Sequence, residues 1–221
     1  GNSQYWGDQR FVSGPVYIGI VVVFLAFLAL VYSSDKRKWA FLAAAILALM
    51  LSWGSNLMGF TEFFLDYLPG YNKFRAVTII LCIAQLCVPL LGAMFLHRLI
   101  KNRKTIKENL MPMYITAGAL GLILLVFMTM PSLVTNFTSN AEQEMLAGID
   151  VTTPQGEYTF DYYDTQFGYL EEARASILKA DALRSFALLS LGFITLLLFI
   201  RGVYNKFVMA SILGVLLLFD L

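Results

Sequence analysis

The chain has 221 residues, of which 58% are apolar, and its formal net charge at pH 7 is +1. Soluble domains contain about 45–50% apolar residues, so the composition excludes an ordinary water-soluble domain and indicates an integral membrane protein. No basic patch lies on a soluble segment, which excludes nucleic acid as a partner. Cys82 and Cys87 lie within one apolar run, and their spacing indicates neither a disulfide framework nor a metal site.

Six apolar runs predict an all-α integral membrane protein, a polytopic helical bundle with about six transmembrane helices. A spanning helix needs about 20 residues, a length that the third and fourth runs reach by themselves. The first, second and fifth reach it only with flanking aromatic residues, and the sixth stops where the sequence stops. In chain order the runs are Val16–Tyr32, Ala40–Trp53 with an extension to Phe60, Ala76–Leu96, Met111–Met130, Ser185–Ile200 and Phe207–Leu221.

The runs divide the chain into three predicted parts. Residues 1–130 hold the first four spans and an outer interfacial loop at 54–75. Residues 131–184 form a small extracytoplasmic cap with a membrane-proximal helix, and residues 185–221 hold the last two spans, of which the final one is truncated. The sequence opens at Gly1 without a signal peptide and stops inside an apolar run, so we expect a piece of a longer protein.

The cap contains two different patterns. Ile149–Thr152 and Tyr158–Tyr162 alternate on either side of a Pro-Gln-Gly turn, which indicates a pair of strands. Over Phe167–Arg184 the apolar residues recur at near-helical spacing. We therefore predict a helix there that continues directly into the fifth span.

The connections between the runs differ in charge. Three of them, Ser33–Lys38, His97–Leu110 and Arg201–Lys206, carry ten basic and two acidic residues, whereas the opposite set carries six basic and twelve acidic ones. Lys and Arg in short loops mark the cytoplasmic side. The pattern predicts a multi-pass protein of the bacterial cytoplasmic (inner) membrane, with both ends of the sequence facing outward and the basic loops against anionic lipid headgroups.

The run FFLDYLPGYNKFR, residues 63–75, holds more functional groups than a plain connection between two helices requires. Its Pro-Gly pair indicates a turn, and its charged residues place it at the membrane surface. Asp66 and Asp8, the acids nearest to the turn and to the first span, are candidates for catalysis by location alone. The candidates for substrate binding are cations, an amide and aromatic residues of this run and of the N-terminal lead-in: Arg75, Lys73, Asn72, Tyr71, Tyr67, Arg10 and Trp6.

A simpler interpretation of the same residues stays open. Tyr and Trp side chains at a membrane surface anchor a protein there, and the cations of the run can form ion pairs with Asp66 or Asp8. No metal-binding spacing accompanies them. Under this interpretation the run is a membrane anchor and has no ligand.

Three motifs at the predicted outer ends of spans resemble the YfhO-type bacterial membrane proteins, in a form similar to versions from Bacteroidota. The motifs are YWGDQRFVSGPVYIG at 5–19, LSWGSN at 51–56 and DYLPGYNKFR at 66–75. Members of this family are long polytopic proteins that resemble GT-C glycosyltransferases, which take sugar from a polyprenyl-phosphate carrier outside the cytoplasmic membrane. The resemblance implies that the chain is a fragment of such a membrane domain.

The resemblance also implies an activity. The parent protein would be a glycosyltransferase whose partners are membrane lipids, a lipid-linked sugar donor and an extracytoplasmic glycan acceptor of the cell envelope. Arg75 and Lys73 would contact the donor phosphate, and Tyr71 and Asn72 would shape the sugar pocket. The catalytic acid of GT-C enzymes usually lies in the first outer loop, which we expect to precede this sequence. The catalytic residue is therefore not carried over, and the cofactor is unknown, with a divalent cation left open for the full-length protein.

Two other functions stay open, a lipid or polysaccharide transporter or flippase and a non-catalytic membrane scaffold subunit. Transporters often place ionisable groups near the bilayer midplane, and the apolar runs are nearly free of charge. A scaffold needs only the helices and leaves the run at 63–75 unexplained. Gln85 is the strongly polar side chain deepest in any run, and we expect it to form an interhelical hydrogen bond.

Overall fold

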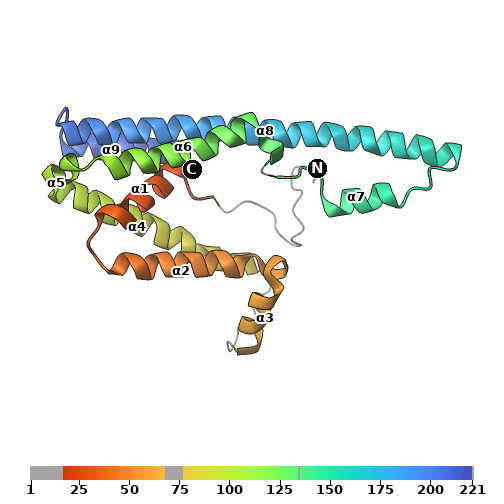
Figure 1. Cartoon of the computed structure of the whole chain (residues 1–221), viewed down its shortest axis with the longest axis horizontal. Coiled ribbons are helices and arrows are strands. Elements are labelled where there is room, and N and C mark those ends of the chain that lie inside the picture. Colours follow the sequence, from red (N-terminus) through yellow and green to blue (C-terminus); the bar gives the residue numbers. More distant parts are fainter. Residues whose placement is uncertain (1–16, 68–76, 134, 221) are drawn as a thin grey trace. The chain divides into compact units, whose positions relative to one another are not determined.

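The computed structural model describes residues 17–67, 77–133 and 135–220. Every regular element among these residues is a helix (Figure 1), so the prediction of an all-α protein is confirmed for this part of the chain. The helical structure has a simple cause. A helix pairs its own backbone N–H and C=O groups, which an apolar medium requires. The apolar side chains recur at helical spacing, and few glycines interrupt them.

Among the described residues, three helices are long and apolar enough to cross a membrane by length and composition. This finding supports membrane association, although it is fewer than the six predicted spans. The remaining apolar helices are shorter, with 13, 16 and 15 residues. The three long helices are α4 (Leu81–Lys101), α6 (Met111–Thr129) and α8 (Pro154–Arg201), and the shorter ones are α1 (Ile20–Tyr32), α2 (Arg37–Ser52) and α9 (Lys206–Asp220).

The chain forms two compact units. Of the described residues, unit 1 comprises 122–133 and 135–186, and unit 2 comprises 17–67, 77–121 and 187–220. The long helix α8 begins in unit 1 and ends in unit 2. Its continuity confirms the prediction that the helix of the cap runs without a break into the fifth apolar run.

Unit 2 is held together by close helix packing around α4, which contacts both α1 and α2. The contact between α2 and α4 is made of small buried residues, Ala45 and Ala48 on one helix and Ala84 and Cys87 on the other. A Cβ added at Gly92 of α4 would come within 3.2 Å of the Leu25 side chain of α1. Small residues allow helix backbones to approach, which is the usual means of packing in a membrane.

Many large apolar side chains remain on the surface of these helices. Leu86 of α4 is 63% exposed and Leu218 of α9 is 77% exposed. A water-soluble protein rarely leaves contiguous surface of this kind uncovered. The exposed apolar surface is therefore what a lipid-facing helix requires.

The predicted strand pair in the cap is wrong. Residues 149–153 form a turn, and the second predicted strand, Tyr158–Tyr162, lies inside α8. Thr153 precedes the helix and its hydroxyl accepts a hydrogen bond from the Gly156 amide at 3.1 Å, which caps the N-terminus. Pro154 occupies the first helical position, where a missing N–H costs nothing. The Pro-Gln-Gly sequence thus starts a helix, and the short alternation of aromatic residues carried no strand.

The predicted outer loop at 54–75 begins with helical structure. Gly54–Leu57 forms a short 3-10 helix, η1, with Gly54 at φ +50°, and α3 (Met58–Tyr67) follows it. The hydroxyl of Thr61 donates to the Gly54 carbonyl at 2.9 Å, which links the two elements. A further 3-10 helix, η3 (Val77–Ile80), precedes α4. The extension of the second run towards Phe60 is therefore a separate helix, broken from α2 at Gly54.

Candidate functional site

Two of the predicted site residues belong to the described part of the chain. Asp66 and Tyr67 are the last residues of α3, and both side chains are exposed. The other candidates lie outside the described residues: Asp8, Trp6, Arg10, Tyr71, Asn72, Lys73 and Arg75. Of the predicted site, the structure therefore describes Asp66 and Tyr67.

Helix α3 presents a row of aromatic rings. The ring centroids of Phe60 and Phe64 are 5.0 Å apart, and those of Phe63 and Tyr67 are also 5.0 Å apart. Residues three or four apart share one side of a helix, so these rings lie next to one another along α3, in tilted contacts. Tyr67 is 74% exposed and adjoins Asp66. A helix that combines exposed aromatic residues with an acid suits the headgroup level of a membrane.

A second polar cluster, which the sequence analysis missed, joins α1 to α9. Asp220 is completely buried. One carboxylate oxygen accepts a hydrogen bond from the Tyr17 hydroxyl at 2.9 Å, and the other accepts from the backbone N–H of Val21 at 3.0 Å. Val21 lies in the first turn of α1, where amides have no partner within the helix. The carboxylate thus caps α1 from another helix and sits at the positive end of its dipole.

The close approach at this cluster depends on Gly19. A Cβ at that position would lie 2.4 Å from the Oδ2 atom of Asp220. The sequence contained one usable signal, an acid at the end of an otherwise apolar run, because an ionisable residue there needs a partner. By contrast Gln85, expected to bond between helices, is exposed and has no hydrogen-bond partner among the described residues.

A third polar cluster lies within unit 1, around Arg174 of α8. The guanidinium binds both carboxylate oxygens of Glu142 at 2.8 and 2.9 Å and donates to the Phe137 carbonyl at 2.6 Å. Arg174 is 2% exposed. A planar guanidinium matches a carboxylate with two parallel hydrogen bonds, which is the strongest form of such a pair.

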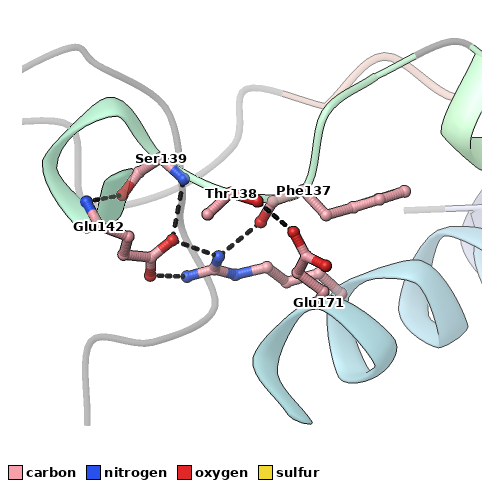
Figure 2. Close-up of polar contacts among 6 residues, drawn as sticks. Phe137, Thr138, Ser139, Glu142 and Glu171 are labelled. Carbon is pink, nitrogen blue, oxygen red and sulfur yellow. Dashed lines mark hydrogen bonds and ion pairs between the residues drawn. The ribbon is translucent and has the colours of Figure 1, made fainter. Parts of the chain in front are cut away.

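Besides pairing with Arg174, Glu142 caps the N-terminus of a helix in the same cluster. Helix α7 (Asn140–Ala147) begins with a capping box, in which Ser139 accepts from the Glu142 amide at 3.2 Å and donates its own N–H to the Glu142 carboxylate at 2.8 Å (Figure 2). Nearby, the Thr138 hydroxyl donates to Glu171 of α8. The hydrogen bonds from Arg174, reinforced by those from Ser139, lower the pKa of Glu142 to about 2. The cluster connects α7 to α8. Its charged and hydroxyl groups form hydrogen bonds with one another.

The three basic connections of the sequence gather at one end of unit 2. Lys101 lines two cavities there, of about 530 and 590 Å³. The smaller one is lined by the 33–37 turn and by the end of α4 with His97 and Arg98, and it contains Asp35. Arg37 pairs with Asp35 at 2.6 Å and lowers the pKa of that carboxyl. The larger cavity is lined by residues of α5 (Arg103–Glu108) and of the turn into α9. Figure 1 shows α5 and this turn at one end of unit 2.

No group of three or more His, Cys, Asp or Glu side chains is placed to hold a metal ion in residues 17–67, 77–133 and 135–220. Comparisons of the chain with family models, curated proteins and solved structures gave no match. The sites described above are therefore interpreted from their own chemistry.

Proposed function

We propose that the chain is part of an integral-membrane glycosyltransferase that uses a polyprenyl-phosphate-linked sugar to modify an extracytoplasmic cell-envelope glycan. The observation that carries the proposal is α3, whose exposed aromatic residues and terminal Asp66-Tyr67 lead directly into the sequence LPGYNKFR. In this proposal the six apolar runs cross the bacterial inner membrane, and both ends of the sequence and α3 face outward.

The chemistry of such a donor matches the groups on and after α3. Its phosphate lies at the headgroup level and requires cations, which Lys73 and Arg75 supply. Its sugar ring has apolar faces that pack on aromatic side chains, and Tyr67 and Tyr71 are suitable. Its prenyl tail requires an apolar surface, and helices such as α4 leave large apolar side chains exposed. Asp66 then orients the cations, and the catalytic acid lies elsewhere in the parent protein.

The test is sugar transfer in cells that lack the full-length gene and carry a variant copy. Arg75→Lys keeps the charge but loses the planar fork that binds two phosphate oxygens. A charge-assisted contact contributes about 1.5–3 kcal/mol, so transfer of labelled sugar onto envelope glycans should fall about 10–100-fold. Tyr67→Ala should also reduce transfer. The matched control is Tyr158→Ala, which removes another exposed tyrosine on α8 and should leave transfer unchanged.

Each variant is first quantified in the membrane fraction, so that a loss of transfer is not a loss of protein. Normal transfer by a well-inserted Arg75→Ala variant would contradict the proposed donor site and leave α3 and the following run as a membrane anchor. Intact transfer in cells without the gene would reject the enzyme altogether and favour a scaffold subunit.

Asp220 gives a specific reason to keep a transporter or flippase as the second candidate. A buried ionisable residue at the end of an apolar helix is a feature of coupled transport. Its two oxygens are nevertheless occupied by Tyr17 and Val21, which is what a structural cap requires. An Asp220→Asn variant that inserts normally and still moves the lipid-linked sugar across the membrane would exclude proton-coupled transport through this residue, whereas selective loss of that movement would favour it.

A further inference from the structure

The larger cavity at the basic end of unit 2 has an unusual lining. Four cations from three helices line it: Lys101 at the end of α4, Arg103 and Lys104 in α5, and Lys206 at the start of α9. None of its lining residues is acidic. In the described part of the chain, no carboxylate oxygen lies within 4.0 Å of these cations. Like charges gathered without a counterion repel one another, so an anion bound here would be favourable.

Two neighbouring groups, the Phe199 ring and the Gly202 backbone, lie close to the Arg103 guanidinium. The guanidinium carbon of Arg103 lies 5.4 Å from the ring centroid of Phe199 in α8, in a cation–π contact. On the opposite chain segment Gly202 adopts φ +90°, and a Cβ there would come within 3.3 Å of an Arg103 nitrogen. Arg103 is therefore positioned by the backbone and the ring that surround it, and this lowers the entropy cost of using it to bind a ligand.

The lining also has unused hydrogen-bonding capacity. The Oδ1 atom of Asn102 is buried and has no partner among the described residues. The N-terminus of α9, by contrast, is already satisfied, because the Asn205 side chain accepts from the amides of Phe207 and Val208 at 3.0 Å each. The attraction for an anion thus comes from the four cations. The Asn102 oxygen is an acceptor and would pair with a donor rather than with an anion, and the end of α9 is already occupied.

Exposed apolar side chains flank the cations. Phe207 follows Lys206 directly and is 71% exposed, and Ile100 precedes Lys101 in the lining of the cavity and is also exposed. A ligand that satisfies both kinds of surface must be amphipathic, with a phosphate beside apolar chains. Lysine and arginine at a membrane surface attract anionic lipids in this way.

We propose that this cavity binds the phosphate of an anionic phospholipid headgroup, with the acyl chains along Ile100 and Phe207. The site is separate from the sugar-donor site proposed at α3, and it holds the basic end of unit 2 at the membrane surface. It narrows the general attraction of basic loops for anionic lipid to one cavity, to which Arg103 of α5 and Lys206 of α9 each contribute one positive charge.

The experiment measures lipid binding to the purified full chain in detergent by native mass spectrometry, with dioleoylphosphatidylglycerol and the zwitterionic dioleoylphosphatidylcholine as probes. Arg103→Gln and Lys206→Gln should each weaken phosphatidylglycerol binding about fivefold, the equivalent of one cation near an anionic lipid. The matched control is Lys107→Gln in α5, which removes the same charge from the same loop but does not line the cavity. It should change binding less than twofold.

Three results would overturn the proposal. An equal loss of binding in Lys107→Gln and in the cavity variants would mean that diffuse loop charge attracts the lipid. Displacement of phosphatidylglycerol by millimolar inorganic phosphate, with phosphate binding that Arg103→Gln weakens, would identify a soluble phosphate as the occupant. Equal affinity for phosphatidylcholine would also reject an anionic headgroup. Retained thermal unfolding temperature in each variant ensures that the comparison is made on folded protein.

Discussion

Among the described residues, each unit buries one charged side chain, and the two charges are compensated in different ways. In unit 1 the guanidinium of Arg174 faces a full opposite charge, the carboxylate of Glu142 at 2.8 Å. In unit 2 the carboxylate of Asp220 faces dipoles, a phenol hydroxyl and a backbone amide. Both charged groups are almost inaccessible, at 2% and 0% exposure.

The difference follows from whether the first amides of α7 and α1 have acceptors of their own. Helix α7 begins with its own capping box, so its first amides are already occupied and Glu142 is free to bind a cation with its outer lone pairs. Helix α1 begins after Gly19 without a side-chain cap of its own. Its unpaired amide at Val21 must be satisfied inside an apolar bundle, and Asp220 of α9 supplies the acceptor. An ion pair between two helices therefore stabilises unit 1, whereas in unit 2 a side chain of α9 caps the N-terminus of α1.

The largest expected effect comes from breaking the pair in unit 1. Arg174→Met leaves the Glu142 carboxylate and the Phe137 carbonyl without their donor. Removing one partner of a buried ion pair costs about 3–5 kcal/mol, so the free energy of unfolding of unit 1 should fall by about 4 kcal/mol. The measurement is hydrogen exchange of the α7 amides in the full chain.

The matched control for this variant is Lys179→Met on the same helix. Lys179 is exposed, and its replacement removes the same charge without touching the cluster, so exchange in α7 should stay unchanged. Equal protection of α7 in the Arg174→Met protein would show that the pair contributes nothing to stability and that the capping box alone holds the helix.

Acid should produce a smaller effect on the same pair. The pKa of Glu142 is lowered from 4.5 to about 2, first by the hydrogen bonds from Arg174. Because the pKa in the folded protein lies below the unfolded value, the stabilisation is complete above about pH 4.5 and is lost as the pH falls towards 2. The shift corresponds to about 3 kcal/mol.

This pH dependence is isolated by a difference measurement. Protection of α7 against hydrogen exchange is followed between pH 6 and 2 in the wild-type protein and in Glu142→Gln, which cannot titrate at this position. The wild-type protein should lose more protection over this range than the variant. Parallel profiles would assign the acid sensitivity to other carboxylates.

The smallest expected effect concerns the cap in unit 2. Asp220→Ala removes the acceptor of the buried Val21 amide and the hydrogen bond from the Tyr17 hydroxyl, and a lost acceptor for a buried donor costs about 1–3 kcal/mol. Gly19→Ala should cost a similar amount, since the new Cβ would lie 2.4 Å from an Asp220 oxygen. In the Asp220→Ala background the Gly19 change should cost less, because the obstructing atom is gone. Unfolding of the single and double variants in bicelles measures this coupling, and strictly additive effects would contradict the contact.

Much of the fold could be predicted from the sequence. Long apolar runs indicated α4 and α6 because a helix is the structure that satisfies its backbone without water. The apolar spacing over Phe167–Arg184 likewise indicated a helix that enters the fifth run. The strand pair failed because five alternating residues are too few to outweigh the cap at Thr153 and the proline after it. Local hydrogen bonds decided the structure there.

The candidate site was less accessible to sequence reasoning. The run that contains Asp66 and Tyr67 stood out by its density of aromatic and charged residues, and α3 places these two at its exposed end. The polar clusters of Arg174 and Asp220 did not stand out, because their partners lie 32 to 203 positions away along the chain. Spacing within a sequence reveals neighbours on one helix and says nothing of which helices meet.

The sequence by itself determined the helical class of the described residues, the apolar character of the long helices and the charge of the connections, since these follow from composition and short-range periodicity. The tertiary structure alone decided which buried charge meets which partner, as with Asp220 beneath α1 and Arg174 beside α7. It also brought the separate basic connections to one end of unit 2. Burial makes such pairings energetically important, and only helix packing determines which groups are buried together.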